Sequence, residues 1–347
     1  MSRVGGRVIL VTGVSMDLGR RFARQLTADP AVDRVIGVDV LPPRGDIGTV
    51  AFVRADIRNP VIAKVIAREQ VDTVVHMSVI AGSGGTGGRT SMKEVNVIGT
   101  MQLLAAAQQA PTLQHLVVKS STSFYGATNR DPAMFTEDMT PKRQARTGFA
   151  KDVSEVESYV RGFARRRPDV TVTTLRAADV IGPLITSPMT SYFKLPVIPT
   201  VFGFDARLQF LHEHDMLGSL QHATLNPVHG TFNVAGDGLL MLSQAIRRLG
   251  RPSLKVPSFA VGSFGSVIGQ ARLADFSPEQ VAFLSFGRGV DTTRMRTVLG
   301  YHPRYSTQAA FADFSTALAP GMFSAARVGA VEHSLTGALT SRSDSGG

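Results

Sequence analysis

Two glycines follow the first apolar segment of the chain at a spacing that suits phosphate binding. The run VILVT at residues 8–12 ends in Gly13, and Gly19 lies six residues further on. Apolar positions then recur at helical spacing, at Leu18, Phe22 and Leu26. A strand, a glycine turn and a helix bring backbone N–H groups and the positive end of a helix to a pyrophosphate. The pattern therefore predicts a nucleotide cofactor.

A carboxylate stands where such a cofactor would place its adenosine ribose. Asp39 ends the second apolar run, about 20 residues after the turn. A carboxylate at this point accepts both ribose hydroxyls and repels a 2′-phosphate, which favours NAD over NADP. The alternative is that Asp39 is an ordinary turn or capping residue.

The turn departs from the usual pattern at its middle glycine, which is replaced by Met16. A methionine side chain narrows the approach of the backbone to a pyrophosphate. Asp17 adds a negative charge that Arg20 or Arg21 could neutralise, or it caps the helix. We expect NAD to bind here, weakly if Met16 enters the cleft. The expected contacts of the turn are Gly13, Ser15, Met16, Asp17, Leu18 and Gly19.

The elements that position these residues alternate along the chain. Strand-like runs are expected at 8–12, 35–38, 50–53, 73–76, 115–119 and 171–175, and helices at 17–28, 59–69, 90–109 and 149–166. This alternation predicts an α/β fold, a doubly wound parallel sheet of the Rossmann type. The alternation of strands and helices ends after Gly182-Pro183, and a smaller substrate lobe is expected from there, over the carboxyl edge of the sheet.

We therefore predict a Rossmann domain over residues 1–183 and a lobe over 184–320 with segments that return to the sheet. Residues 321–347 lose their periodicity and predict a disordered tail. The stretch GSGGTGG at 82–88 is interpreted as a flexible loop near the site or as a passive connector.

Composition excludes several classes of protein. The 347 residues include no cysteine, which excludes disulfides, zinc–thiolate sites and thiol nucleophiles. No apolar run is long enough for a membrane span, and the N-terminus lacks a signal peptide, so a cytoplasmic protein is expected. The net charge is +10. The basic residues of the chain are dispersed, and no aromatic residues alternate with them. This favours a basic surface suited to phosphorylated ligands over nucleic-acid binding.

Several segments in order carry a resemblance to a known family: V-T-G with Gly19, Val38-Asp39, Ala55-Asp56-Ile57, Val75-His76-Met77, VNVIGT at 95–100, SSTSFYG at 120–126, Leu175-Arg176 to Gly182-Pro183, Phe210-Leu211-His212 with Asp215, GTFNV at 230–234 and LGYHP at 299–303. Over about residues 7–305 the chain resembles the extended short-chain dehydrogenase/reductase family, which includes UDP-sugar 4-epimerases and nucleotide-sugar dehydratases. The resemblance implies NAD as cofactor and a nucleotide sugar or a related hydroxyl compound as substrate.

The resemblance also assigns roles to single residues. Asp56 and Ile57 would flank the adenine, and Asn96 would help to orient the catalytic groups. Cofactor contacts are further expected at Met77, Ser78 and Lys151.

Family members move a hydride between nicotinamide and a sugar carbon while a Tyr, in the motif Y-x-x-x-K, moves the hydroxyl proton. Ser121 matches the catalytic serine, Ser123 a second hydroxyl, and Lys151 the lysine. Thr147 stands in place of the tyrosine, and its hydroxyl is a poor base because its pKa lies far above that of tyrosine. The usual mechanism therefore lacks its base.

Three interpretations follow. Tyr125 or a group of the substrate could replace the base, Thr147 could support slow or partial chemistry, or the protein could be a catalytically silent nucleotide-binding module that acts through partners.

The substrate side departs from the family too. Asp179 replaces an asparagine that helps to hold the nucleotide diphosphate, and it would repel phosphate unless a cation pairs with it. The family's substrate arginine falls on Leu208, and the adjacent Arg207 points the other way in a strand. Ser121, Tyr125, Asp179 and Arg207 are the candidate substrate contacts.

Two further expectations concern metal and assembly. His212 and His214 could share a strand face as metal ligands, but the resemblance makes them the end of a strand, and no metal is expected. The helices at 90–109 and 149–166 carry apolar residues on more than one face. Since the equivalent helices form a four-helix dimer interface in the family, we predict a homodimer.

Overall fold

A parallel sheet forms the centre of the computed structural model, which describes residues 6–79, 92–142, 145–257 and 277–318. The sheet has seven strands in the order β11-β6-β5-β4-β1-β2-β3, and every neighbouring pair is parallel. Its strands are β1 (Arg7–Thr12), β2 (Val32–Asp39), β3 (Ala51–Arg54), β4 (Thr73–His76), β5 (His115–Ser121), β6 (Thr171–Ala177) and β11 (Gly230–Val234). The strand order reverses between β1 and β4, which is where doubly wound sheets bind ligands.

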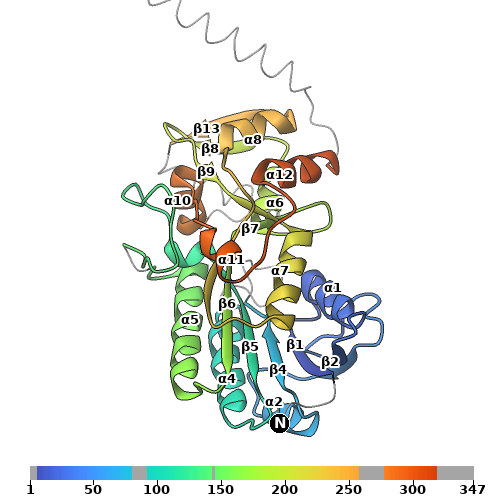
Figure 1. Ribbon diagram of the computed structural model, residues 1–347. Coiled ribbons are helices and arrows are strands. Elements are labelled where there is room, and N and C mark those ends of the chain that lie inside the picture. Colours follow the sequence, from blue (N-terminus) through green and yellow to red (C-terminus); the bar gives the residue numbers. More distant parts are fainter. Residues whose placement is uncertain (1–5, 80–91, 143–144, 258–276, 319–347) are drawn as a thin grey trace, which may run out of the picture.

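Helices cover the two faces of this sheet (Figure 1). The helices α1 (Asp17–Leu26) and α7 (Glu213–Leu225) pack against each other on one face. On the other face lie α2 (Val61–Arg68), the π-helical segment η1 (Glu94–Gly99), α4 (Thr100–Gln108) and α5 (Gly148–Arg166). The doubly wound α/β fold is therefore as predicted, and the helix expected at 90–109 is split into η1 and α4 over its described part.

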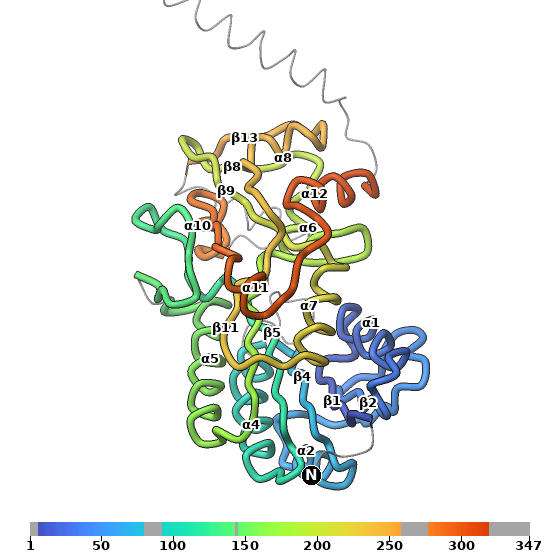
Figure 2. The backbone as a smooth tube through the Cα atoms, in the orientation of Figure 1, coloured from blue at the N-terminus to red at the C-terminus, as the bar shows by residue number. Residues whose placement is uncertain are grey.

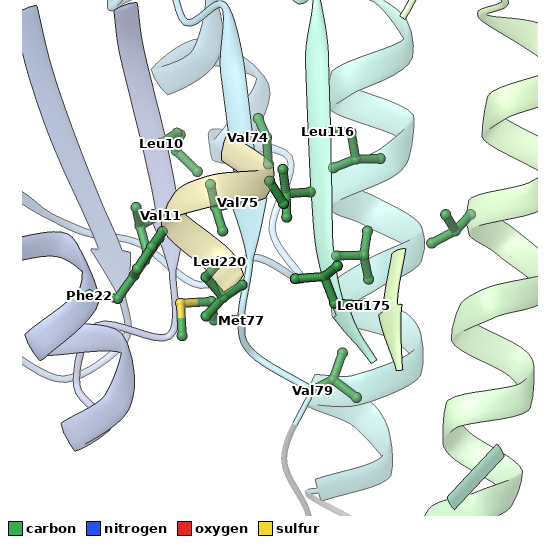
Figure 3. Close-up of a cluster of buried hydrophobic side chains, with 14 of the residues drawn as sticks. Leu10, Val11, Phe22, Val74, Val75, Met77, Val79, Leu116, Leu175 and Leu220 are labelled. Atoms are coloured by element: carbon green, nitrogen blue, oxygen red, sulfur yellow. The ribbon is translucent and has the colours of Figure 1, made fainter. Parts of the chain in front are cut away.

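Apolar strand residues make the main core. The strands consist largely of β-branched and aliphatic residues because both faces of a parallel sheet are buried. Figure 3 shows part of this cluster, with Val75 and Met77 close to Leu220 of α7. Met77 and Val79, which follow β4 directly, thus extend the core to the carboxyl edge of the sheet.

A second apolar cluster lies beyond that edge, in the upper part of Figures 1 and 2. Its strands pair as β10-β7, β12-β9 and β13-β8. These elements are β7 (Asp179–Ile181), β8 (Ile198–Val201), β9 (Arg207–Leu208), β10 (Phe210–His212), β12 (Leu240–Met241) and β13 (Ser253–Val256), with α6 (Pro188–Phe193), α8 (Leu242–Leu249), α10 (Pro278–Phe286) and α12 (Thr307–Thr316). Phe193, Phe210 and Phe311 meet in its centre. We call this cluster with its elements the lobe.

The domain boundaries stay predictions, and the expected tail at 321–347 and the glycine-rich stretch at 82–88 lie outside the described residues. Within the described part of the chain, no helix has both the length and the apolar character needed to cross a bilayer.

Candidate functional site

The glycine turn between β1 and α1 requires glycine at both of its ends. Gly13 has a φ of +81°, which side-chain-bearing residues rarely adopt. A Cβ on Gly19 would lie 2.1 Å from the carbonyl oxygen of Gly13, so the helix could not pack on the turn with any larger residue. Met16 precedes α1 in an extended conformation, and its side chain is 47% exposed. The first turn of α1 therefore presents backbone N–H groups that have no acceptor within the helix.

Asp39 faces this turn from the end of β2. Its Oδ2 accepts hydrogen bonds from the Ser15 backbone N (2.9 Å) and from Ser15 Oγ (2.7 Å), and its Oδ1 accepts one from the Val40 N (2.8 Å). A carboxylate offers about four acceptor positions, so capacity for a ribose hydroxyl remains. Asp17 pairs with Arg20 at 2.6 Å and with Arg21 at 3.6 Å, which offsets its charge at the helix end.

A cleft of about 150 Å³ opens beside the turn at the carboxyl edge of the sheet. Cavities of about this volume hold one six-membered ring. Sequence analysis had singled out several of its lining residues: Gly13, Met16, Leu18, Gly19, Met77, Ser121 and Asp179. The lobe contributes residues 185–188, and Lys119 and Phe149 also line it. The cleft thus joins the glycine turn, the end of β5 and the lobe.

The residues expected to flank an adenine lie at the end of β3. Arg58 binds Asp56 at 2.7 Å and Glu94 of η1 at 2.9 Å, and its hydrogen bond lowers the pKa of Asp56. Ile57 packs against Gly99, where a Cβ would lie 2.7 Å from its Cδ1. Ser78 lies against Gly13, since a Cβ there would be 3.2 Å from the Ser78 N.

Asn96 connects η1 to α5. It is fully buried, and its Nδ2 donates to Asp152 Oδ2 at 3.2 Å. Asp152 is the neighbour of Lys151, so Asn96 fixes the helix that carries the lysine. A π-helical turn at this point agrees with the frequent use of such turns at functional sites.

Ser121 and Ser123 lie together at the end of β5. Ser121 Oγ accepts from the Ser123 backbone N at 3.1 Å and begins the short 3-10 helix η2 (Thr122–Tyr125). Ser123 Oγ accepts from Arg288 Nη2 at 3.3 Å. Ser121 thus lies at the cleft, and no described residue accepts its hydroxyl proton, which can be donated to a ligand.

Thr147 and Lys151 lie at the start of α5, and neither is among the residues that line the cleft. Thr147 is the exposed N-cap of the helix, and its side chain makes no capping hydrogen bond. Glu279 of α10 occupies the helix N-terminus instead, where it accepts from the Ala150 N at 3.0 Å. Lys151 Nζ lies 3.5 Å from Glu155 Oε1, and its side chain is 37% exposed. Ser121 lines the cleft, whereas α5 and its N-cap contribute only Phe149 to that lining among the described residues.

Tyr125 lies in the core, away from the cleft. Its hydroxyl donates to Asn233 Oδ1 at 2.8 Å and accepts from Arg176 Nη1 at 2.8 Å, and its ring stacks on Phe135. Burial raises the pKa of Tyr125. Because its proton is committed within the core, Tyr125 is a structural residue in this arrangement.

The substrate side holds one buried cation that the motifs did not indicate. Arg288 donates to the Gly126 carbonyl at 2.8 Å, and its Nε is buried without a partner among the described residues. Burial raises the pKa of Asp179, while the charge of Arg288 acts in the opposite direction. Arg207 contributes its backbone carbonyl to the Arg288 N at 2.9 Å, and its side chain is not among those that line the cleft.

Two residues of the site were missed by sequence analysis, Lys119 and Arg288. A signal for Lys119 existed, because it is a charged residue in an apolar strand, two positions before Ser121 and so on the same face. Arg288 had no such signal, since its partner Ser123 lies 165 residues away.

His212 ends a strand, as the resemblance implied, whereas His214 lies in the first turn of α7. His212 closes β10 and caps α7, where its Nδ1 accepts from the His214 N at 3.2 Å. Its Nε2 lies 2.9 Å from Asp313. A wider groove of about 590 Å³ lies between α1, α7 and residues 301–305, away from the glycine turn and Ser121.

Comparison with known proteins agrees with this geometry. Two uncharacterized proteins, from Mycobacterium bovis and Mycobacterium tuberculosis H37Rv, are 47% identical over 312 residues, which is 89% of this chain and 83% of each relative. The UDP-glucose 4-epimerase of Thermotoga maritima, solved with UDP-glucose, has a TM-score of 0.69 at 15% identity and covers 89% of this chain and 98% of its own.

The dTDP-glucose 4,6-dehydratase of Bacillus anthracis, solved with NAD, has a TM-score of 0.67 at 17% identity and covers 90% of this chain and 96% of its own. The UDP-glucuronic acid 4-epimerase of Bacillus cereus, also solved with NAD, has a TM-score of 0.64 at 17% identity and covers 89% of this chain and 98% of its own. The model of the NAD dependent epimerase/dehydratase family matches residues 9–200. With its sheet order, glycine turn and cleft, this chain belongs to the NAD dependent epimerase/dehydratase family.

Proposed function

We propose that this protein binds NAD and uses it to oxidise a hydroxyl group of a nucleotide sugar, or of a related hydroxyl compound, within an epimerase- or dehydratase-type reaction. The observation that carries the proposal is the cleft itself, which brings the glycine turn, Ser121 and the lobe residue Asp179 around one space. Family membership supports the cofactor, and the UDP-glucose in the Thermotoga epimerase suggests the substrate class.

The residues present fit the cofactor. Gly13 and Gly19 leave the space that a Cβ would fill, and the N-terminus of α1 favours a negative group. In this proposal the turn from Gly13 to Gly19 holds the pyrophosphate and Asp39 the adenosine ribose. Asp56 and Ile57 flank the adenine, and Lys151 binds the nicotinamide ribose. When bound, NAD accepts the hydride of the substrate carbon.

In this proposal, polar groups at the carboxyl end of β5 bind the substrate. Ser121 donates its hydroxyl proton to the reacting oxygen and so stabilises developing charge. Asp179 would repel the phosphates of a nucleotide sugar, but Arg288 places a positive charge close to it and offsets the repulsion. Ser123, held by Arg288, and Arg207 of β9, whose carbonyl accepts from the Arg288 N, complete the candidate substrate side.

A second candidate function is favoured by one observation, the exposed position of Thr147 outside the cleft. If no other group moves the proton, the protein binds NAD and a nucleotide without turnover and acts through partners.

Homodimerisation through α4 and α5 also stays a proposal. It is supported by the exposed apolar side chains of Ile98, Met101 and Tyr159 on these helices and on η1.

The variant Thr147→Tyr distinguishes the two functions. We expect the wild-type protein with NAD to convert UDP-glucose or dTDP-glucose, measured by proton NMR of the sugar products. Thr147→Tyr should change that rate by less than about threefold, because position 147 lies outside the cleft and an added base there contributes little. Turnover that appears only in Thr147→Tyr would show that the natural protein is a binder.

A further inference from the structure

Lys119 lines the cleft and forms no ion pair with any residue that the structure describes. Lys119 and Ser121 point to the same face of β5, because residues alternate along a strand, and both line the cleft. Ser120, between them, points to the other face and donates to Glu157 of α5 at 2.6 Å. Lys119 therefore shares one space with the serine expected to bind the reacting oxygen.

The surroundings of Lys119 favour a neutral amine. Its Nζ donates to the Val79 carbonyl at 3.3 Å, and no carboxylate of the described residues forms an ion pair with it. Burial lowers the pKa of Lys119 to about 8, from an ordinary value of 10.5. About one-tenth of the amine is then unprotonated at pH 7, and this neutral form is the one that a general base requires.

Titratable groups on elements that pack against β5 or line the cleft are His76, Asp179 and Glu213, besides Glu157 of α5, which is paired with Arg176. His76 on β4 is fully buried, and its pKa is lowered to about 4, first by burial and then by Lys119, so it is neutral. Asp179 on β7 lines the same cleft, and burial keeps its pKa raised. Glu213 on α7 is paired with Arg21 at 2.9 Å. Among the described residues, none of these groups forms an ion pair with Lys119 Nζ, and burial is the cause that lowers the pKa of Lys119.

The two other candidates for the proton-transferring group, Thr147 and Tyr125, do not line the cleft. Thr147 is exposed outside the cleft, and Tyr125 is bonded to Arg176 and Asn233 in the core. Building on the proposed function, we propose that Lys119 is the catalytic acid–base of this protein and takes over the role of the absent tyrosine.

The proton and electron balance of the step is simple. The neutral Nζ of Lys119 takes the proton of the substrate hydroxyl and becomes an ammonium, while the hydride of the same carbon passes to NAD and the C–O bond becomes a carbonyl. Ser121 holds the oxygen throughout. In the return step the ammonium gives its proton back to the oxygen as the carbonyl is reduced.

The test uses the full chain with NAD and compares Lys119→Met and Lys119→Arg with Lys64→Met, a control at an exposed position of α2. Conversion of UDP-glucose and dTDP-glucose is followed by proton NMR from pH 6 to 9.5. The wild-type kcat should rise with pH, with a midpoint near 8, because the neutral amine is the active form. Lys119→Met should lose about 100-fold or more in kcat, and with it the pH dependence, at little changed KM.

Lys119→Arg should be equally inactive, since a guanidinium stays protonated, and Lys64→Met should behave as wild type. A readout without turnover is competitive acetylation with acetic anhydride across pH, followed by mass spectrometry. Lys119 should react with a midpoint near 8 and be protected by NAD, whereas Lys64, exposed on α2, should gain no protection from NAD.

The outcomes separate the two proposals. A wild type that turns over, with a Lys119→Met variant of equal kcat and pH profile, would overturn the role of Lys119 and leave the proposed function standing. Acetylation of Lys119 with a midpoint above 10 would also overturn that role. A wild type that converts neither sugar nucleotide would overturn the proposed function, and the role of Lys119 with it.

Discussion

Replacing Arg176 with methionine is expected to lower the free energy of unfolding by about 3–5 kcal/mol, because it removes the only buried counter-ion of the Glu157 carboxylate among the described residues. Arg176 and Glu157 are only 5% and 3% exposed, and two guanidinium nitrogens approach the carboxylate at 2.7 and 2.9 Å. The guanidinium also lies 3.7 Å from the centre of the Phe124 ring. Urea unfolding followed by circular dichroism measures the loss.

A matched control exists on the same carboxylate. Arg161 approaches Glu157 at 3.6 Å but is 57% exposed, so Arg161→Met should cost less than about 1 kcal/mol. The double variant Arg176→Met with Glu157→Met should recover much of the lost stability, since no buried charge is left alone. Equal unfolding midpoints for Arg176→Met and Arg161→Met would contradict this account of the core.

The same ion pair matters for the site. Ser120 donates to Glu157 and lies between Lys119 and Ser121, so the pair anchors the end of β5 to α5. We therefore expect Arg176→Met to loosen the cleft as well as the core. The arginine does not touch the cleft, and its role is to position the strand.

Replacing Gly19 with alanine is expected to weaken NAD binding by about 100-fold, equivalent to roughly 3 kcal/mol. The new Cβ would lie 2.1 Å from the Gly13 carbonyl oxygen, a backbone atom that cannot turn aside. Helix α1 must then move away from the turn that it shares with the cofactor. Isothermal titration calorimetry with NAD measures the change.

Gly162→Ala on α5 provides the control for Gly19→Ala. A Cβ there meets only the flexible end of Arg166, at 3.3 Å, and alanine favours a helix. This variant should bind NAD as wild type does. If Gly19→Ala also binds NAD as wild type while its thermal unfolding is unchanged, the turn does not hold the pyrophosphate.

The parts of the site that are local in sequence could be predicted from it. β1, the glycine turn and α1 form one segment, and apolar runs of strand length predicted the neighbouring strands that bring Asp39 to the turn. Packing of a parallel sheet leaves few alternatives for such runs. The fold class followed from the alternation of strand-like and helical segments along the chain.

The remaining features depend on contacts between distant segments. Thr147 lies outside the cleft in a helix start closed by Glu279, which is 129 residues away from its partner Ala150. Tyr125 matched a family segment, which allowed it to be either a catalytic base or a core residue. Its hydrogen bonds to Arg176 and Asn233, which decide for the core, could not be read from the motif. A motif gives the type of a residue, whereas its direction is set by packing that the sequence does not display.

The most direct test of the account is a calorimetric titration of the wild-type protein and of Asp39→Ala with NAD and with NADP. We expect the wild type to bind NAD at least tenfold more tightly than NADP, because in the proposed site a carboxylate at Asp39 would accept ribose hydroxyls and repel a 2′-phosphate. Asp39→Ala should lose that preference. A wild type that gives no heat with either dinucleotide would contradict the claim that NAD binds at the glycine turn and the adjoining cleft.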